Sequence, residues 1–352
     1  MGDRRVRVIG DGPAGCAAAI ALARRGVPVT IVRAATEQRG RHGGESLPPA
    51  IAPLLSGLDL LSEFTSGPHL RCYGNESAWG HPALHLFSFM TSPHGCGWHI
   101  DRPAFDRMLL SAAARAGARI TDASDERDAG AFVVDATGRD AGVARSCGVT
   151  RTYVDHLIAL LSSWRTSSSR VRSSTSLVEA AEHGYWYSAP LPFNRMFCAY
   201  VTDSELWARR QGSACEVWQA LLKSAPHTSK RLADYEPTQS LRVVPAGTSR
   251  LRAMHGDGWL AAGDAAACRD PLSSGGIYEA LRSGVRAADA IARHFDGEPA
   301  ALAHYADDLE ARFTRDLLRR RHFYSREHRW PESSFWANRR KSVSSWRPDT
   351  SV

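Results

Sequence analysis

Three glycines near the start of the chain have the spacing that cradles a phosphate group. Gly10, Gly12 and Gly15 form the pattern G-x-G-x-x-G. In such a loop the first glycine permits a tight turn, the second lets the backbone approach a pyrophosphate, and the third lets a helix pack on a sheet. The helix that follows supplies free N–H groups and the positive end of its dipole. The residues assigned to phosphate binding are Gly10, Gly12, Pro13, Ala14 and Gly15.

A second group of residues with binding chemistry lies far along the chain. Asp264 follows an apolar run and Gly263, which predicts a carboxylate at the C-terminal edge of a strand. A carboxylate there can accept hydrogen bonds from sugar hydroxyls. A Pro/Gly turn then opens a new helix, whose free N–H groups could stabilise negative charge beneath a flat ligand. The residues assigned to this part of the site are Gly263, Asp264, Pro271, Gly275, Gly276 and Ile277.

One part of a dinucleotide site is absent from its usual position. The acid that holds a ribose hydroxyl is expected at the end of the second strand, where this chain has Arg33. An arginine at this point could accept a 2′-phosphate, as in NADP sites. Alternatively, Arg33 only caps the strand, and nearby Glu37 or Arg39 takes over part of the role. The sequence leaves both interpretations open.

The elements that must position these residues read as strand, glycine turn, helix and strand. Residues 6–9 are of β type, residues 14–25 form an alanine-rich helix closed by Gly26, and residues 29–32 are β-branched. This order is a βαβ unit, whose strands are parallel. Further helices are expected at 105–117, 205–222, 278–294 and 300–329, and further strands at 132–135, at 197–201 and from Trp259. The pattern predicts one nucleotide-binding domain built from non-adjacent stretches, with a second domain inserted into it.

Composition excludes several classes of protein. The 352 residues suffice for about two domains. The hydrophobic fraction of 43% and charged fraction of 23% are typical of globular chains, which excludes wholesale disorder. The net charge is +7, but three lysines among 44 basic residues leave 41 arginines scattered along the chain. That spread favours a bias in composition over a nucleic-acid footprint.

The same composition bears on location and metals. No apolar run approaches the ~18 residues of a membrane span. The seven cysteines include no C-x-x-C pair and no set with zinc spacing. Widely spaced, odd-numbered thiols fit a reducing compartment. We therefore expect a cytoplasmic protein with no metal site, no membrane association and no nucleic-acid partner.

Taken in order, the motifs resemble the FAD-dependent monooxygenases of the aromatic-hydroxylase fold, most closely the tryptophan-halogenase-like branch. They are the glycine loop at 10–15, Gly44-Glu45-Ser46 with Pro48-Pro49, Arg102-x-x-Phe105-Asp106, Asp135-Ala136-Thr137-Gly138, and Gly263-Asp264 with Asp270-Pro271. Tyr305 and residues 323–340 are similar to the subgroup that modifies a tryptophan in quinone-cofactor enzymes.

The resemblance implies an α/β protein in which a discontinuous Rossmann-type FAD-binding domain carries an inserted, mixed β-sheet substrate domain and a C-terminal helical segment. We expect the FAD-binding domain at residues 1–65, 100–150 and 241–300, the substrate domain at 66–99 and 151–240, and the C-terminal helix and tail at 301–352.

The resemblance also assigns FAD to the residues above. The glycine loop would hold the phosphates, Asp264 the ribose, and residues 271–277 would back the isoalloxazine ring, with Arg41, Glu45, Ser46 and Arg102 lining the cofactor. Reduced flavin carries charge near N1, which a helix N-terminus would stabilise. The alternatives are that Glu45 is a surface carboxylate and that Arg102 belongs to an exposed salt bridge.

The chain departs from the halogenase pattern in two places. Halogenases of this branch carry W-x-W-x-I-P and a catalytic lysine after the G-E-S motif. Here the corresponding stretch is Tyr185-Trp186-Tyr187-Ser188-Ala189-Pro190, and no lysine precedes Lys223. Without a lysine to relay hypohalous acid, the flavin hydroperoxide would transfer oxygen directly to an electron-rich ring. That reaction needs a substrate carbon held over the flavin and water excluded, and few acids or bases.

Aromatic residues of the inserted regions are the candidates for substrate walls, although each is more often plain core. Trp98, Tyr185 and Trp186 are assigned to the substrate; Trp79 and Tyr187 are further candidates. His99 and Glu45 are the candidate catalytic residues, and His85 and His94 are other possible proton shuttles, although a lone histidine is usually structural.

The sequence thus predicts an FAD-dependent monooxygenase that hydroxylates an indole- or tryptophan-type ring, free or within a peptide or protein, using O2. NAD(P)H or a separate flavin reductase would supply electrons. The first alternative is a flavin-dependent halogenase with an altered relay. The second is a non-catalytic FAD-binding protein that escorts a partner.

Overall fold

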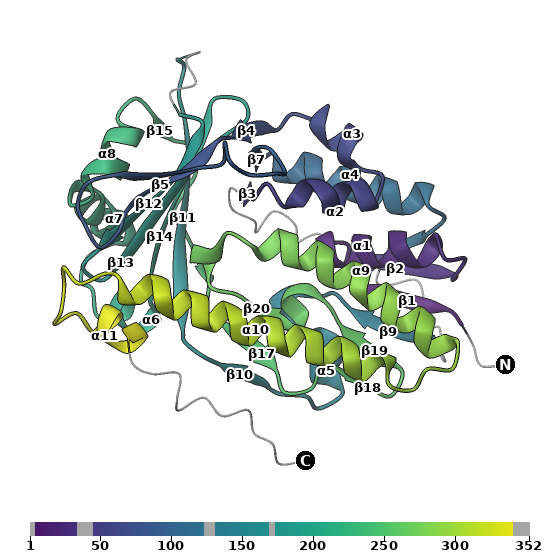
Figure 1. Ribbon diagram of the computed structural model, residues 1–352. Helices are drawn as coiled ribbons and strands as arrows, with labels where there is room; N and C mark the ends of the chain where they lie inside the picture. Colours follow the sequence, from purple (N-terminus) through teal and green to yellow (C-terminus); the bar gives the residue numbers. More distant parts are fainter. Residues whose placement is uncertain (1–3, 34–44, 123–130, 169–172, 341–352) are drawn as a thin grey trace.

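The computed structural model describes residues 4–33, 45–122, 131–168 and 173–340 (Figure 1). Their strands include a six-stranded sheet in the order β18-β19-β9-β1-β2-β8. Its strands are β1 Val6–Ile9, β2 Val29–Arg33, β8 Arg119–Asp122, β9 Phe132–Asp135, β18 His255–Gly256 and β19 Trp259–Ala261. All neighbours are parallel except β18 and β19. The βαβ unit expected from the glycine turn is therefore confirmed, because β1 and β2 pair in parallel across α1.

Small residues let the helices of this domain pack closely. Helix α1 (Pro13–Ala23) is buried along almost its whole length, since alanines bring little bulk to any face. It packs against α9 (Gly276–Phe295) and α4 (Arg102–Arg115). At the contact of α1 with α9, a Cβ on Gly284 would lie 2.2 Å from the carbonyl oxygen of Ala14, so only glycine fits. Helix α4 buries the face predicted for 105–117.

A mixed eight-stranded sheet forms the second body of the protein and stands on the left of Figure 1. Its order is β15-β11-β14-β13-β12-β5-β6, and β16 also pairs with β11. The strands are β5 Gly74–Ala78, β6 His85–Ser88, β11 Leu157–Arg165, β12 Thr175–Ala181, β13 Gly184–Leu191, β14 Arg195–Asp203, β15 Glu236–Pro237 and β16 Arg242–Pro245. Helices α7 (Ala214–Lys223) and α8 (Pro226–Leu232) cover its outer face.

The helix expected over 205–222 is wrong as a single element. The structure has α6 (Ser204–Ala208), a break, and then α7. Gly212 adopts φ +99°, which a helix cannot continue, and Ser213 starts α7 through a capping box with Glu216. Because Ser213 and Glu216 satisfy the first N–H groups of α7, the chain gains a new helix start here.

Two small sheets connect the large bodies. Strands β3 (Glu45–Leu47), β7 (Gly97–Ile100) and β4 (Leu70–Cys72) form one of them, with β7 in the centre. Strands β10 (Arg151–Tyr153), β17 (Ser249–Leu251) and β20 (Ala267–Cys268) form the other. Short helices complete this part: α2 Ile51–Gly57, α3 Leu61–Thr65, α5 Gly142–Ser146 and the 3₁₀ turns η2 Gly138–Asp140, η3 Gly263–Ala265 and η4 Pro271–Ser273.

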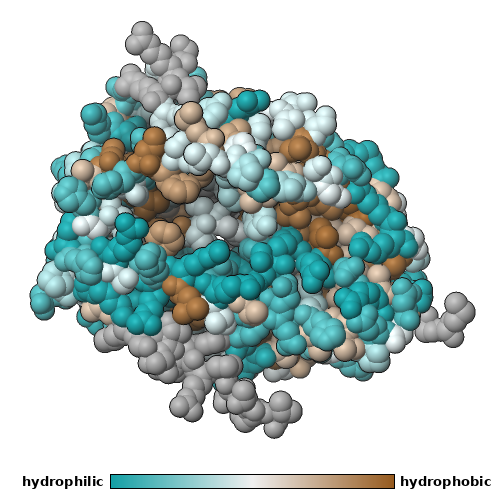
Figure 2. Space-filling view, in the orientation of Figure 1, coloured by the Kyte–Doolittle hydropathy of each residue, from teal (hydrophilic) through white to brown (hydrophobic). Residues whose placement is uncertain are grey.

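The C-terminal helix α10 (Ala301–Ser325) runs across the front of the molecule, from the six-stranded sheet to the eight-stranded one (Figure 1). Helix α11 (Ser334–Arg340) follows it and inserts Phe335 and Trp336, both fully buried, beside the large sheet. Figure 2 shows a mainly hydrophilic front face on which apolar residues gather in separate patches. Within the described residues, every helix is too short or too polar to cross a bilayer.

Candidate active site

The N-terminus of α1 is shaped to receive a phosphate. A Cβ on Gly10 would lie 2.3 Å from the carbonyl oxygen of Ala136, and one on Gly15 would lie 2.0 Å from that of Gly10. These two glycines are therefore required by the fold itself. A Cβ on Gly12, by contrast, meets no described atom within 4 Å, and no described side chain caps the helix there. Gly12 leaves open space in front of uncapped N–H groups, which fits the pyrophosphate of FAD.

The fold brings Asp264 to this helix end. A Cβ on Gly263 would lie 2.8 Å from Cβ of Ala14, so η3 lies directly against the first turn of α1. The backbone N–H of Gly263 donates to Ser283 Oγ at 2.9 Å, which fixes η3 to α9. Nε of Arg139 lies 3.8 Å from the Asp264 carboxylate, whose side chain remains 40% exposed. An accessible carboxylate beside the glycine loop suits a sugar hydroxyl.

Arg33 is engaged by acids at the end of β2. Its Nε lies 3.7 Å from the carboxylate of Asp11 and 3.9 Å from that of Asp122. Asp11 belongs to the glycine loop, so Arg33 holds this loop to the strand end. The geometry supports the strand-capping interpretation over the 2′-phosphate one. Glu37, Arg39 and Arg41 lie outside the described residues.

Arg102 is not the exposed salt-bridge residue of the alternative interpretation. Its side chain is only 10% exposed, and Nε donates to the Asp106 carboxylate at 2.8 Å, within α4. Burial raises the pKa of Asp106, with Arg102 opposing the rise and Asp11 adding to it. The pair therefore lies near the glycine loop. Its contact with the cofactor stays a prediction.

A second uncapped helix start lies at residues 271–277. Asp270 caps η4 by accepting from the N–H of Leu272 at 2.9 Å, and Ser274 adopts a left-handed conformation with φ +46°. Helix α9 then begins after Gly275, and no described side chain caps it. A Cβ on Gly276 meets no described atom within 4 Å. This open start is the part predicted to back the flavin ring.

Asp270 also anchors this segment in a buried polar network. Its carboxylate accepts from Nε of Arg320 at 2.6 Å and from the hydroxyls of Tyr324 at 3.0 Å and Tyr185 at 3.3 Å. Arg320 makes a second ion pair of 2.6 Å, with Asp155. Burial alone lowers the pKa of Arg320, but the two carboxylates outweigh it and raise the pKa overall. Helix α10 thus holds the residue that starts the predicted flavin segment.

Ser46 links the small sheet to the large one. Its Oγ lies 2.8 Å from Nδ1 of His99 and 2.6 Å from the hydroxyl oxygen of Tyr187. Ser46 and His99 are register partners on β3 and β7, whereas Tyr187 comes from β13. Burial lowers the pKa of His99 to about 3, and Arg231 adds to the effect, so the imidazole is neutral at neutral pH. Its Nε2 is buried and has no hydrogen-bond partner among the described residues.

The structure buries both tryptophans that the sequence analysis assigned to the substrate. Trp98 packs edge-on against Phe64 in the core of the FAD-binding side, with ring centroids 5.1 Å apart. Trp186 is fully buried against Tyr200 and Trp218, toward the covering helices. Strand alternation is the reason, because Trp186 points to the opposite face of β13 from Tyr185 and Tyr187. Both tryptophans pack in core clusters, and their contact with a substrate stays a prediction.

Tyr185 is also buried, at 1% exposure, and its hydroxyl is committed to Asp270. His85 and His94 are exposed, on and near β6. The backbone of Glu45 pairs with Ile100 in the β3–β7 ladder, and its side chain is outside what the structure describes. No group of His, Cys, Asp and Glu among the described residues could hold a metal. The sequence analysis assigned no site role to Arg320 or Tyr324, although both fall in the predicted helix 300–329 and Tyr324 also falls in the segment 323–340 that resembles the tryptophan-modifying subgroup.

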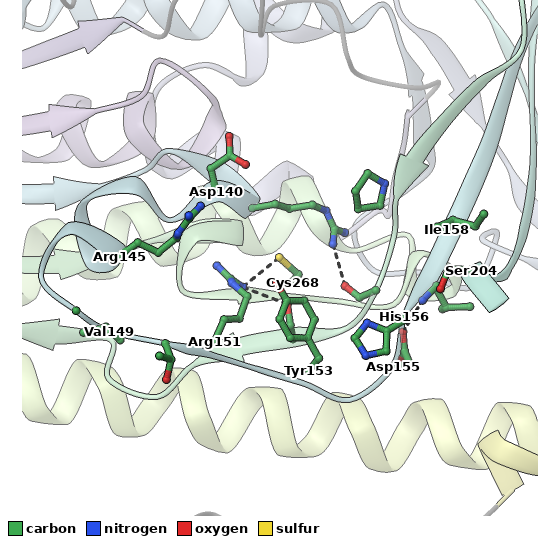
Figure 3. Close-up of a pocket in the computed structure, with 17 residues that line it drawn as sticks. Asp140, Arg145, Val149, Arg151, Tyr153, Asp155, His156, Ile158, Ser204 and Cys268 are labelled. Atoms are coloured by element: carbon green, nitrogen blue, oxygen red, sulfur yellow. Dashed lines mark hydrogen bonds between the residues drawn. The ribbon is translucent and has the colours of Figure 1, made fainter. Parts of the chain in front are cut away.

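A pocket of about 670 Å³ opens beside Arg139 (Figure 3). Arg151 lies in its wall and donates to the carbonyl oxygen of Ala265 at 2.6 Å, and Tyr153 stacks on His156 with centroids 5.4 Å apart. None of the residues predicted to bind the cofactor lines this pocket. Arg139 and Arg151 donate to backbone carbonyl oxygens, of Gly247 and of Asp264 and Ala265, so both guanidinium groups are engaged within the fold.

Comparison with known proteins gives relatives that bind flavin. A family model described as glucose inhibited division protein A matches residues 5–52, which contain the glycine loop. LodB of Marinomonas mediterranea, a putative FAD-dependent oxidoreductase, is 26% identical over 94% of this chain and 95% of its own length.

Among solved structures, the flavin-dependent halogenase CmlS superposes with a TM-score of 0.84, at 26% identity, over 97% of this chain and 68% of its own. QhpG, described as a peptidyl tryptophan dihydroxylase essential for tryptophylquinone cofactor biogenesis, gives a TM-score of 0.77 at 24% identity, over 99% of this chain and 80% of its own. The predicted α/β FAD-binding fold is confirmed by these similarities.

Proposed function

We propose that this chain, an FAD-dependent oxidoreductase with the fold of the flavin-dependent halogenases and hydroxylases, hydroxylates an electron-rich, indole-type ring. The observation that carries the proposal is the hydrogen-bonded line Tyr187–Ser46–His99. It joins the G-E-S strand predicted to line FAD to the face of the eight-stranded sheet that Tyr187 occupies. Hydrogen-bonded hydroxyl and imidazole groups between the predicted cofactor and the sheet suit proton transfer to and from a bound aromatic ring.

FAD, once bound and reduced, supplies the activated oxygen atom from O2. The chain's own residues would bind and position it: Gly12 would leave room for the pyrophosphate, Asp264 would hold the ribose, and the start of α9 would face the ring. Hydroxylation replaces a ring hydrogen, so a proton must leave the substrate. Ser46 Oγ is within hydrogen-bond distance of both the Tyr187 hydroxyl and His99 Nδ1, so it passes that proton between them. With a pKa of about 3, His99 does not keep that proton at neutral pH and acts only to relay it.

Halogenation has less support. The halogenase pattern needs a lysine after the G-E-S motif, and this chain has none before Lys223. Strand β5, which lies at 74–78 after the G-E-S motif, reads Gly-Asn-Glu-Ser-Ala and therefore also has no lysine. A tryptophan held within a peptide or protein is the substrate we favour over a free indole, because QhpG, of the same fold, is described as acting on peptidyl tryptophan. NAD(P)H or a separate reductase would deliver the electrons.

The test is the mass of the product. The purified protein, reduced FAD and O2 should add the mass of one or two oxygen atoms to a tryptophan-containing peptide, and the label should come from ¹⁸O2 and not from H₂¹⁸O. Adding bromide should leave the product unchanged. A brominated product would establish the halogenase instead. Bound FAD that oxidises without altering any aromatic would favour the escort protein.

Removing the phenol of Tyr187 should slow turnover while leaving the cofactor in place. In Tyr187→Phe the proton line loses one end, and we expect kcat to fall by about 100-fold, the scale of a lost proton-transfer group. The FAD spectrum and KM should change little. Tyr73→Phe is the matched control, since Tyr73 is 48% exposed and away from the line. An unaltered kcat and pH profile in Tyr187→Phe would remove the relay from the mechanism.

A further inference from the structure

The C-terminal half of α10 carries a second, outward face with a mixed character. We define the α10 stripe as the exposed residues that recur every three or four positions there, namely Arg315, Leu318, Arg319, His322, Phe323 and, just beyond the helix, Arg326. This spacing places them along one side of the helix. The opposite side, with Phe313, Leu317 and Tyr324, is buried. One side of the helix therefore packs on the core, and the other side exposes a row of basic and apolar side chains to solvent.

The apolar members of the stripe are more exposed than a folded chain usually leaves large side chains. Leu318 is 56% exposed and Phe323 is 50% exposed. Together with Arg319 and His322 they line a shallow hollow of about 600 Å³. Helix α10 crosses the front of the molecule in Figure 1, and Figure 2 shows this band as hydrophilic with a small apolar patch. Two exposed apolar side chains thus lie beside positively charged ones in one hollow.

The arginines of the stripe differ from Arg312 and Arg320, which lie on the same helix and form ion pairs with the fold. Arg312 pairs with Glu279 at 2.9 Å, and Arg320 pairs with Asp155 and Asp270. For Arg315, Arg319 and Arg326, no carboxylate within the described part of the chain comes within ion-pair distance. The stripe itself contains no acid. It thus offers positive charges that the fold leaves uncompensated, next to two exposed apolar side chains.

We propose that the α10 stripe docks an acidic, amphipathic helical segment of a partner protein. Carboxylates at the spacing of one helical turn would meet Arg315, Arg319 and Arg326, and leucine-type residues between them would cover Leu318 and Phe323. A single-stranded nucleic acid would stack a base on Phe323 but would leave Leu318 uncovered. A membrane surface would need a wider apolar face than two side chains provide. The occupant with complementary charge and shape is therefore a polypeptide.

This docking surface adds a protein partner to the proposed function. It rests on that function in one respect, because a substrate carried on a peptide or protein needs a surface to bind. The stripe lies outside the residues assigned to FAD. Binding to it can therefore be measured without turnover, so its failure and the failure of the hydroxylase proposal are separate results.

The probe is a fluorescein-labelled peptide of about 20 residues with glutamate and leucine at alternating three- and four-residue spacing. We expect micromolar binding to the full chain that weakens as salt is added. Arg315→Glu, Arg319→Glu and Arg326→Glu together should weaken it more than 10-fold, an order of magnitude expected for losing several charge pairs. Leu318→Ser with Phe323→Ser should weaken binding at all salt concentrations.

The matched control changes the same net charge elsewhere on the surface. Arg107, Arg209 and Lys223 are exposed and lie off α10, so their reversal to glutamate should leave peptide binding intact. Equal loss in both charge variants would show general attraction and overturn the proposal. The proposal would also be overturned if the same arginines were needed to bind phosphatidylglycerol vesicles or single-stranded DNA while the peptide did not bind. Melting temperatures close to that of the parent chain would verify that each variant is folded.

Discussion

Alanine at position 12 should weaken FAD binding by about 10- to 100-fold and leave the apoprotein nearly as stable as before. In Gly12→Ala the new Cβ meets no described atom within 4 Å, and the residue has an ordinary φ of −77°, so the fold accepts it. The methyl group instead occupies the space in front of α1 that we assign to the pyrophosphate. Overpacking a tight contact costs about 1–3 kcal/mol, which corresponds to that range of affinity.

The measurement is a fluorescence titration of apoprotein with FAD, next to thermal melting without FAD. Gly57→Ala is the silent control, because a Cβ at Gly57 also meets no described atom and α2 is away from the loop. Gly15→Ala is the opposite control. Its Cβ would lie 2.0 Å from a backbone oxygen, so stability and FAD binding should fail together. Unchanged FAD affinity in Gly12→Ala would place the pyrophosphate elsewhere.

Asp270→Ala should destabilise the protein strongly. It removes the shared partner of Arg320, Tyr324 and Tyr185 from a site where the Asp270 side chain is only 4% exposed. Breaking a buried ion pair from one side costs about 3–5 kcal/mol. Arg320 keeps its second ion pair with Asp155, so we expect a loss of about 3 kcal/mol, the lower end of that range. Denaturant unfolding followed by circular dichroism measures this loss.

Two comparisons make the Asp270 result specific. Asp296→Ala breaks the ion pair with Arg4, whose partners are 68% and 51% exposed, and should not change the unfolding midpoint measurably. Tyr324→Phe removes one hydroxyl and keeps the ion pair, so its loss should be clearly smaller. The visible spectrum of bound FAD should also shift in Asp270→Ala, since Asp270 starts the segment assigned to the flavin ring. Stability equal to that of the parent chain would mean that the network contributes little.

Local signals were enough to predict the cofactor side of the protein. Each of the signals used there depends only on residues close in sequence. They are the glycine spacing at 10–15, the β-branched strand at 29–32 and the Gly263–Asp264 turn. The structure brings these segments together as expected, with η3 against α1. Helix 105–117 was also readable, because its apolar spacing coincides with the buried face of α4.

The substrate side was harder to predict, for physical reasons. Tyr185, Trp186 and Tyr187 are consecutive aromatics, and only strand alternation separates the residue near Ser46 from one in the far core. That alternation was available once 184–191 was recognised as a strand. The partners of Asp270, in contrast, lie 50 and 54 residues away on α10. No local pattern identifies them, because the tertiary fold alone brings Arg320 and Tyr324 to the loop.

The tie between Asp270 and α10 has a consequence for biosynthesis. The glycine loop is synthesised long before Arg320 and Tyr324, whose side chains bind Asp270. A nascent chain can therefore order its glycine loop before it can anchor the segment that we predict to lie beneath the flavin ring. We expect a chain that ends before residue 320 to retain FAD poorly, because Asp270 then lacks Arg320 and Tyr324.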